Sequence, residues 1–212
     1  MITYTNTEAT VLLLSGKKVS MVSDDLDLSG TKIKTLPDNL TVGGGLNLGN
    51  TPIKSIGNNL TVTKSISLSH TPINELGRNL TVGGGLWLIG TAQLKTLPDN
   101  LTVGTDLRLE RANITSFGNG LSVGRDLYLT DARVTKLPNG IIVRRDLWLS
   151  YTPIESLPPT LTIGGDLWLT GTPIESLPDN LTVGGDLWIN NTPNLDTNNL
   201  PSSLVVIGTI YK

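Results

Sequence analysis

The four tryptophans of the chain all occupy one position of a recurring apolar-X-apolar triplet, between its two apolar residues. The column of residues at this position is Asp27, Asn47, Ser67, Trp87, Arg108, Tyr128, Trp148, Trp168, Trp188 and Tyr211. Because apolar residues alternate with it, the column is expected on the outer face of half-buried strands. Neighbouring strands lie about 4.8 Å apart, so Trp148, Trp168 and Trp188 should form a stacked stripe. An exposed aromatic patch is typical of an interaction site.

The stripe also has a purely structural interpretation. Aromatic residues at neighbouring cross-strand positions stabilise a sheet, and near-identical repeats copy a residue by duplication. However, Asp27, Asn47 and Ser67 hold the same position in the first three units, which must stack without aromatic rings. We therefore take the column from Trp87 to Trp188, with Arg108 and Tyr128 within it, as a candidate partner site.

A second column lies on the same face, two residues before the first. It contains Asp106, Asp126, Asp146, Asp166 and Asp186, of which the last four join the candidate site. Like charges at this spacing repel by roughly 1 kcal/mol per pair in water. Two compensations remain open: backbone N–H groups could hold the carboxylates, or a partner's Arg and Lys could pair with them and lie over the indoles. A metal array is not expected, because each unit supplies one carboxylate and no second ligand at fixed spacing.

No pattern indicates catalysis. The single histidine, His70, has no Cys, Ser–Asp or His partner at a recognisable spacing, and we interpret it as a turn residue. Glycine runs such as "TVGGGL" lack the Lys-Ser or Lys-Thr of a phosphate loop. A glycosidase needs two carboxylates in different environments, whereas these aspartates are translational copies. We expect no catalytic residue, no metal and no cofactor.

A repeat must position both columns. The apolar triplets begin at Leu26, Leu46, Ile66, Leu86, Leu107, Leu127, Leu147, Leu167 and Leu187, and so recur every 20 residues with one step of 21 at Gln93. The segment "SLVVIGTIYK" aligns with "NLTVGGDLWI" and puts Ile210 in register with Leu187. A shortened unit, "VLLLSGKKVSMV", precedes the first triplet and aligns at Leu12. Stacked units of this kind bury a continuous core that no unit could bury alone.

One complete unit is "DLWLTGTPIESLPDNLTVGG", from Asp166 to Gly185. Period-two alternation and turn spacing predict that its inward residues are Leu167, Leu169, Ile174, Leu177, Leu181 and Val183. The pair Gly184-Gly185 should form a tight return, where a side chain would obstruct the chain or φ must be positive.

The pattern L-x-L-x-x-T-x-I-x-x-L-P resembles a leucine-rich repeat in which Thr replaces the usual Asn. It is similar to short 20-residue repeats of bacterial effector proteins and to the "LSGTxIxxLP" variant of plant immune receptors. It most closely resembles uncharacterised "LPDNLTVGGDLxLxGT" repeat proteins of tailed phages and their hosts, over about Leu12 to Lys212. The resemblance implies a right-handed solenoid of about ten coils with a concave, partner-binding strand face. Because the opposite side lacks a helical period, we expect an all-β fold with little or no helix, or alternatively a parallel β-helix.

We expect one continuous solenoid domain in three parts. Residues 1–24 would form an N-terminal cap with the truncated repeat, residues 25–191 the regular repeats, and residues 192–212 a longer link with the last strand. An open solenoid end exposes unpaired strand edges. Since little sequence is left to cover the last strand, the C-terminal edge is the candidate for self-association.

Composition limits the setting and the partners. The formal net charge is −2 and cysteine is absent, so neither a nucleic-acid nor a membrane partner is indicated and no disulfide framework exists. The triplet Asn-Leu-Thr, a formal glycosylation acceptor, recurs at tight turns from Asn39, Asn59, Asn79, Asn100 and Asn180. We expect a cytoplasmic protein of a bacterium or of a phage-infected cell.

Two classes of function fit these patterns. The first is a non-enzymatic, protein-binding solenoid, phage- or prophage-encoded, that engages a basic host or phage protein through an aromatic and acidic concave face. The alternatives are a glycan-binding β-helix, since sugar rings stack on indoles and sugar hydroxyls bond to carboxylates, or a structural component of a virion.

Overall fold

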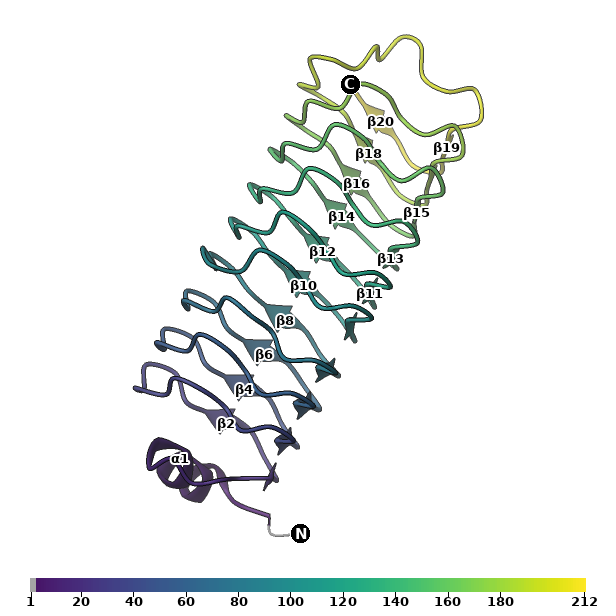
Figure 1. The fold of residues 1–212 in the computed structure, drawn as a ribbon. Helices are drawn as coiled ribbons and strands as arrows, with labels where there is room; N and C mark the ends of the chain where they lie inside the picture. The colour runs from purple at the N-terminus through teal and green to yellow at the C-terminus, as the bar shows by residue number, and fades with distance from the viewer. Residues whose placement is uncertain (1–2) are drawn as a thin grey trace.

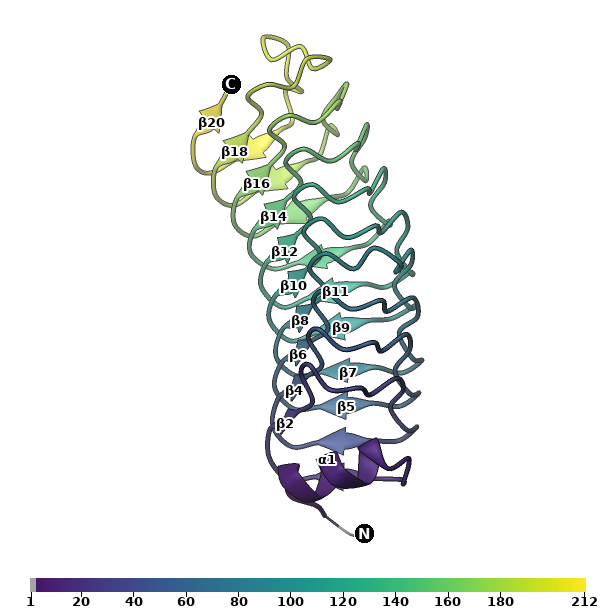
Figure 2. The ribbon, with the colours of Figure 1, turned by 90° about the vertical axis from the view of Figure 1, so that its left-hand side faces the viewer.

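The chain folds into an elongated stack of coils, shown in Figures 1 and 2. The computed structural model describes residues 3–212. A single helix, α1 (Asn6–Leu14), is followed by twenty strands of two residues each, which form two parallel ten-stranded sheets. The prediction of a solenoid of about ten 20-residue coils, almost entirely β, is confirmed.

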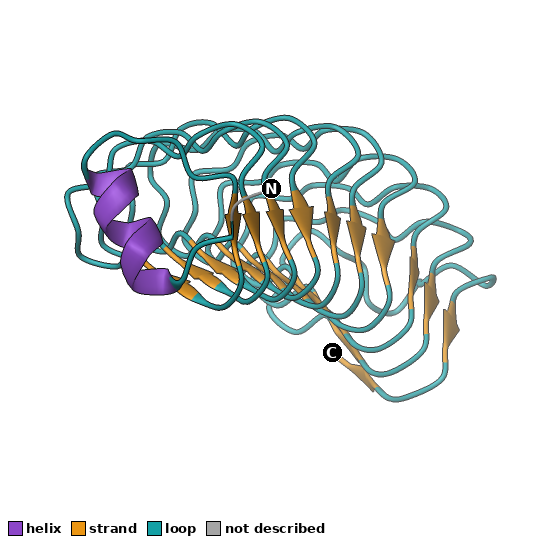
Figure 3. Cartoon of the chain, turned by 90° about the horizontal axis from the view of Figure 1, so that it is seen from below, coloured by secondary structure: helices purple, strands orange, loops and turns teal. Residues whose placement is uncertain are grey.

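Each coil contributes one strand to each sheet. The odd-strand sheet contains β1 (Met21–Val22), β3 (Thr41–Val42), β5 (Thr61–Val62), β7 (Thr81–Val82), β9 (Thr102–Val103), β11 (Ser122–Val123), β13 (Ile142–Val143), β15 (Thr162–Ile163), β17 (Thr182–Val183) and β19 (Val205–Val206). The even-strand sheet contains β2 (Leu26–Asp27), β4 (Leu46–Asn47), β6 (Ile66–Ser67), β8 (Leu86–Trp87), β10 (Leu107–Arg108), β12 (Leu127–Tyr128), β14 (Leu147–Trp148), β16 (Leu167–Trp168), β18 (Leu187–Trp188) and β20 (Ile210–Tyr211). Figure 3, which shows the stack obliquely from below, displays the two rows of strands; the remaining side of each coil is loop.

The register follows the apolar triplets. Leu107 pairs with Leu86, so the extra residue of the 21-residue step is absorbed in a turn, and Ile210 pairs with Leu187 as predicted. In the unit from Asp166 to Gly185, all six predicted inward residues are buried. The third side of the coil has no continuous strand within residues 3–212; isolated bridges, such as Thr35 to Ser55, and bonds such as Asn39 N–H to Asn58 O join its coils.

The threonine that recurs after the second apolar residue of each triplet has a structural role. Thr51, Thr71, Thr91, Thr152, Thr172 and Thr192 are all buried. In each case the hydroxyl donates to the carbonyl oxygen three residues earlier, as from Thr172 Oγ1 to Leu169 O at 2.7 Å. The bond satisfies a polar group that would otherwise be costly to bury. Ala112 and Ala132 fill the position with an apolar group instead.

The N-terminal end differs from the structure that the alignment of the repeat units predicts. Leu12 to Leu14, which we aligned with a strand triplet, lie in α1, so this part of the alignment is wrong. The "MV" that ends the truncated unit forms β1. A capping box starts the helix: Glu8 N–H donates to Thr5 Oγ1, and Thr5 N–H donates to the Glu8 carboxylate. Ala9 and Leu13 are buried in the common core, so α1 covers the first coil. The one helix of residues 3–212, α1, does not have the length and apolarity needed to cross a membrane.

The C-terminal end is less covered. Leu195 and Leu200, in the long link before β19, are only partly buried against the core. Val205, Ile207 and Tyr211 expose 49%, 76% and 38% of their surface. Self-association through this edge stays a prediction.

Of the two reasons predicted for the glycine pair at the end of the unit, steric obstruction and a positive φ, the structure shows only the first. Gly184 and Gly185 do not have positive φ. A Cβ on Gly185 would instead collide with Asp166 Oδ1, and one on Gly184 with the carbonyl oxygen of Gly164. The obstruction is not the same in every coil, since Arg144 and Arg145 hold the equivalent positions.

One left-handed position of each coil lies in the turn after the even strand, and a second occurs in several coils in the turn before the odd strand, as at Asn39 and Asn59. Gly30, Asn50, His70, Gly90, Arg111, Asp131, Tyr151, Gly171 and Asn191 all have φ between 56° and 70°. His70 is thus a turn residue, as predicted. A left-handed backbone costs a residue with a Cβ roughly 1–2 kcal/mol.

Replacing Arg111 by glycine is therefore expected to stabilise the protein. The strain at φ 57° is relieved, and the extra freedom of glycine in the unfolded chain offsets part of the gain, which leaves about 0.5–1 kcal/mol. The exposed ion pair lost with it, Arg111 Nε to Asp131 Oδ2 at 3.8 Å, contributes little. Urea unfolding of Arg111→Gly measures the difference, and a lower midpoint than that of the wild type would contradict it.

Candidate functional site: the aromatic and acidic face

The aromatic column forms a continuous stack on the outer face of the even-strand sheet. Ring centroids are 5.7 Å apart between Tyr128 and Trp148, 4.3 Å from Trp148 to Trp168, 4.3 Å from Trp168 to Trp188, and 3.8 Å from Trp188 to Tyr211. The planes are inclined by 20°, 7°, 6° and 10° in the same order. We call these five residues the aromatic stack. Its regularity follows from the strand pairing that places the residues side by side.

The stack covers its own ring faces. Each indole from Trp148 to Trp188 lies between two other rings, so a partner can reach only its edge. The expectation that a partner's Arg or Lys lies over these three indoles is therefore wrong, because a neighbouring ring already occupies that space.

The N-terminal end of the stack is also closed. Arg108 Cζ lies 4.9 Å from the centre of the Tyr128 ring. Its guanidinium is held by Glu110, with Nη2 to Oε1 at 2.6 Å and Nε to Oε1 at 2.9 Å. Arg108 therefore supplies from within the chain the cation that we expected from a partner.

The predicted aspartate column is a hydrogen-bonded ladder. The backbone N–H groups of Asp126, Asp146, Asp166 and Asp186 each donate to Oδ1 of the aspartate one coil earlier, at 3.3, 3.1, 2.9 and 2.7 Å. Thr209 N–H donates to Asp186 Oδ1 at 2.7 Å and ends the aspartate ladder. Of the two compensations left open by the sequence, backbone bonding is the one present. It lowers the energy of each carboxylate and joins successive coils.

The ladder leaves charge available at its C-terminal end. Arg145 is the only cation of residues 3–212 that pairs with it, at 3.5 Å from Asp126 Oδ1 and 3.8 Å from Asp146 Oδ2. Asp166 and Asp186 form no ion pair within the described chain and are half-buried. Their Oδ2 atoms are therefore the free acceptors beside Trp168 and Trp188.

Tyr128 links the two columns. Its hydroxyl donates to Asp126 Oδ2 at 3.2 Å. Burial raises the pKa of the Tyr128 hydroxyl, and the negative charge of Asp126 raises it further. Tyr128 therefore remains protonated and keeps donating at physiological pH.

The sequence does not predict the hydrogen bonding of the indole nitrogens. Nε1 of Trp148, Trp168 and Trp188 is buried and has no acceptor among residues 3–212. In the coil of Trp87 the aspartate position is Gly85, and a Cβ built there would lie 3.1 Å from Trp87 Nε1. In this coil the N–H edge of the indole faces the aspartate position. The sequence does not predict this orientation.

Trp87 and its surroundings differ from the stack. Its side chain is 41% exposed, and it has no ring partner among the described residues. Trp87 is therefore not part of the aromatic stack, although it lies in the same column of the sequence.

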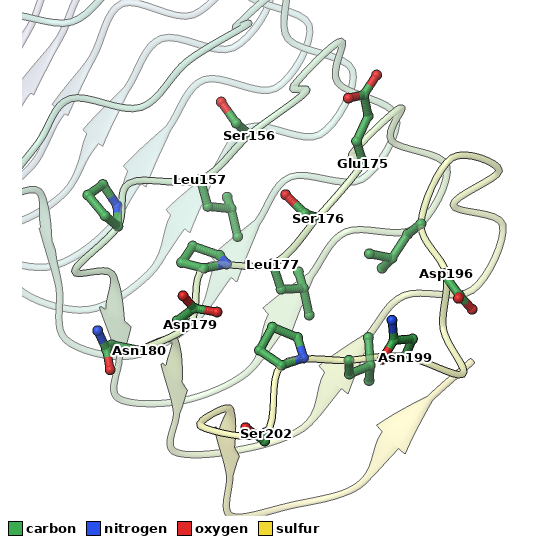
Figure 4. Close-up of a pocket in the computed structure, with 15 residues that line it drawn as sticks. Ser156, Leu157, Glu175, Ser176, Leu177, Asp179, Asn180, Asp196, Asn199 and Ser202 are labelled. Atoms are coloured by element: carbon green, nitrogen blue, oxygen red, sulfur yellow. The ribbon is translucent and has the colours of Figure 1, made fainter.

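A groove of about 880 Å³ lies on the turn side of the last coils (Figure 4). It forms where the link after β18 departs from the regular coil, and Glu175, Asp179 and Asp196 line it together with Leu177 and Leu200. No three His, Cys, Asp or Glu side chains in residues 3–212 come together as a metal site. The groove therefore adds acidic surface without a defined ligand geometry.

No protein-family model matches the chain, and comparison with curated proteins and with solved structures finds no significant match.

Proposed function

We propose that the protein is a non-enzymatic binding solenoid whose partner is a protein with exposed Arg or Lys side chains. The supporting observation is the continuous stripe of ring edges beside carboxylates that are only partly neutralised. The stripe extends over five coils, from Tyr128 to Tyr211. It combines apolar contact area with charged acceptors, which is typical of the aromatic centre and polar rim of an interface.

Binding would occur edge-on. The aliphatic stems of the partner's basic side chains would cover the edges of Trp168 and Trp188, while their charged ends bond to Oδ2 of Asp166 and Asp186. Guanidinium suits this arrangement because it is planar and donates two parallel hydrogen bonds. Each Oδ1 would keep its backbone bond, so binding requires no rearrangement of the coils.

The resemblance of the repeat to those of tailed phages makes a host or phage protein the proposed partner, met in the cytosol. The side chains of the Asn-Leu-Thr turns support that setting. Asn59 Nδ2 donates to Asn39 Oδ1 at 2.9 Å, and Asn79 Nδ2 donates to Asn59 Oδ1 at 2.9 Å. A glycan attached to either nitrogen would disrupt this pairing.

Neutralising the free end of the aspartate ladder is expected to abolish binding without unfolding the protein. In Asp166→Asn/Asp186→Asn the amide oxygens still accept the backbone bonds, but two charges are lost. Charge-assisted bonds contribute more than neutral ones, so capture of the partner from a bacterial lysate should fall at least tenfold while the melting temperature changes little. Capture by the wild type should also weaken as salt is added.

Asp179→Asn is the matched control, because it removes a carboxylate from the turn side, in the groove of Figure 4. Proteins retained by the wild type and by Asp179→Asn, but lost from the double variant, would support the proposal. Equal retention by all three would contradict it.

A further inference from the structure

A second hollow lies on the same sheet, over the first coils. It has a volume of about 430 Å³ and is lined by Asp27, Asn47, Ser67 and Trp87 of the aromatic column, with Asp25 and Lys64 among its other residues. It exists because the first three column positions carry short side chains, so the surface drops below the level of the Trp87 ring. A hollow of this size lies within the range of small-ligand sites.

One face of Trp87 is open toward this hollow. Ser67 pairs with Trp87 on the N-terminal side, and a serine is too short to cover an indole. Arg108 lies on the other side, where its guanidinium is directed to Glu110 and Tyr128. Trp87 is thus the only tryptophan whose ring face is available, since the other three are stacked on both sides.

The polar groups of the hollow are fixed in orientation and incompletely used. Asp27 Oδ1 accepts from Ser29 N–H at 2.9 Å, and Asn47 Oδ1 accepts from Gly49 N–H at 3.1 Å. Asn47 Nδ2 and the Ser67 hydroxyl have no hydrogen-bond partner within residues 3–212, whereas the Asp27 carboxylate also interacts with the Ser29 side chain. The Ser29 N–H bond lowers the pKa of Asp27, so this carboxylate is ionised at neutral pH. An acceptor, a donor and a hydroxyl are therefore aligned at the strand spacing of about 4.8 Å.

We propose that this hollow binds a neutral sugar ring. The C–H face of a pyranose would lie on the open face of Trp87, whose π-cloud attracts weakly positive C–H groups. Its hydroxyls, which both donate and accept, would bond to Asp27, Asn47 and Ser67. The site is distinct from the three indoles of the aromatic stack, which have a ring on both faces and cannot hold a sugar ring there.

Other ligand classes fit less well. Asp25 and Asp27 oppose an anion, and Lys64 is already paired with Asp25, with Nζ to Oδ1 at 3.3 Å. A metal ion has no group of three suitable side chains in the described chain. A flat apolar molecule would leave the three polar groups unbonded, which is costly once water is displaced.

The test uses methyl glycosides of glucose, galactose, mannose and N-acetylglucosamine as probes, followed by saturation-transfer NMR and calorimetric titration of the whole chain. We expect at least one to bind in the millimolar range and to lose affinity at least tenfold in Trp87→Ala. Ser67→Trp should have the same effect for a different reason, because a new indole at the position paired with Trp87 would cover its open face. Asp179→Asn, on the turn side of the last coils, should bind as the wild type does.

Three results would overturn the proposal. One is the failure of all four glycosides to bind the wild-type chain. Another is binding that persists in both Trp87→Ala and Ser67→Trp. Displacement of a bound glycoside by N-acetyl-lysinamide at equal concentration would also count against it, since the hollow would then be a cation site. The melting temperature of each variant shows whether a lost signal reflects the site or the fold.

Discussion

Replacing Leu147 by aspartate is expected to unfold the middle of the solenoid while the coils nearest α1 stay folded. Leu147 is fully buried in β14, between Leu127 and Leu167. An unpaired carboxylate there costs several kcal/mol. In a repeat protein each coil contacts only its neighbours, so the damage need not spread through the whole stack. Hydrogen exchange should show lost protection from β12 to β16 and retained protection in the coils of β2 to β8.

Thr162→Asp is the control for this first prediction. Thr162 lies on the exposed side of β15, so the same charge there should leave exchange nearly unchanged. If Leu147→Asp instead loses all protection in one cooperative step, the coils are coupled over longer distances than their contacts suggest.

The second large effect is expected at the centre of the aromatic stack. Trp168→Ala removes two ring contacts at 4.3 Å, each contributing about 0.5–1.5 kcal/mol beyond area burial. It also exposes the neighbouring rings. We expect the free energy of unfolding to fall by about 2–3 kcal/mol, measured by urea unfolding. The stack therefore has a structural role in addition to any role in binding, and a lower melting temperature alone cannot separate the two.

Trp87→Ala supplies the comparison within the same column. Its indole is exposed and unstacked, so removal should cost less than about 1 kcal/mol. Equal losses for Trp87→Ala and Trp168→Ala would show that the ring contacts contribute little to stability.

The register and the core were predictable because every coil repeats the same apolar alternation. Leu187 and Ile210 could be aligned across a longer link, since shifting a strand by one residue would turn its apolar side chains outward. The helix could not be predicted in this way. The run "VLLL" suits a buried strand or a helix, and the capping box of Thr5 and Glu8 was the signal that separates them.

The candidate site was predictable in its positions but not in its contacts. The sequence places Trp148, Trp168 and Asp166 on one face. It does not show whether a carboxylate accepts a backbone hydrogen bond or remains free to pair with a partner. The covered ring faces could have been inferred, because strands about 4.8 Å apart leave no room for a cation between rings. The hollow beside Trp87 forms because the side chains before it in the column are short. The short residues Asp27, Asn47 and Ser67 could therefore have indicated it from the sequence.

The near-identity of successive coils also affects how this protein can evolve. Asp146 to Asn190 contains almost the same segment twice, and each copy joins the next through the same backbone bond to an aspartate. Unequal recombination between the copies would insert or delete a whole coil and leave the interior unchanged. Such an event would lengthen or shorten the stripe by one ring and one carboxylate. The length of the solenoid can thus change by one whole coil at a time through duplication, and each intermediate sequence would still fold.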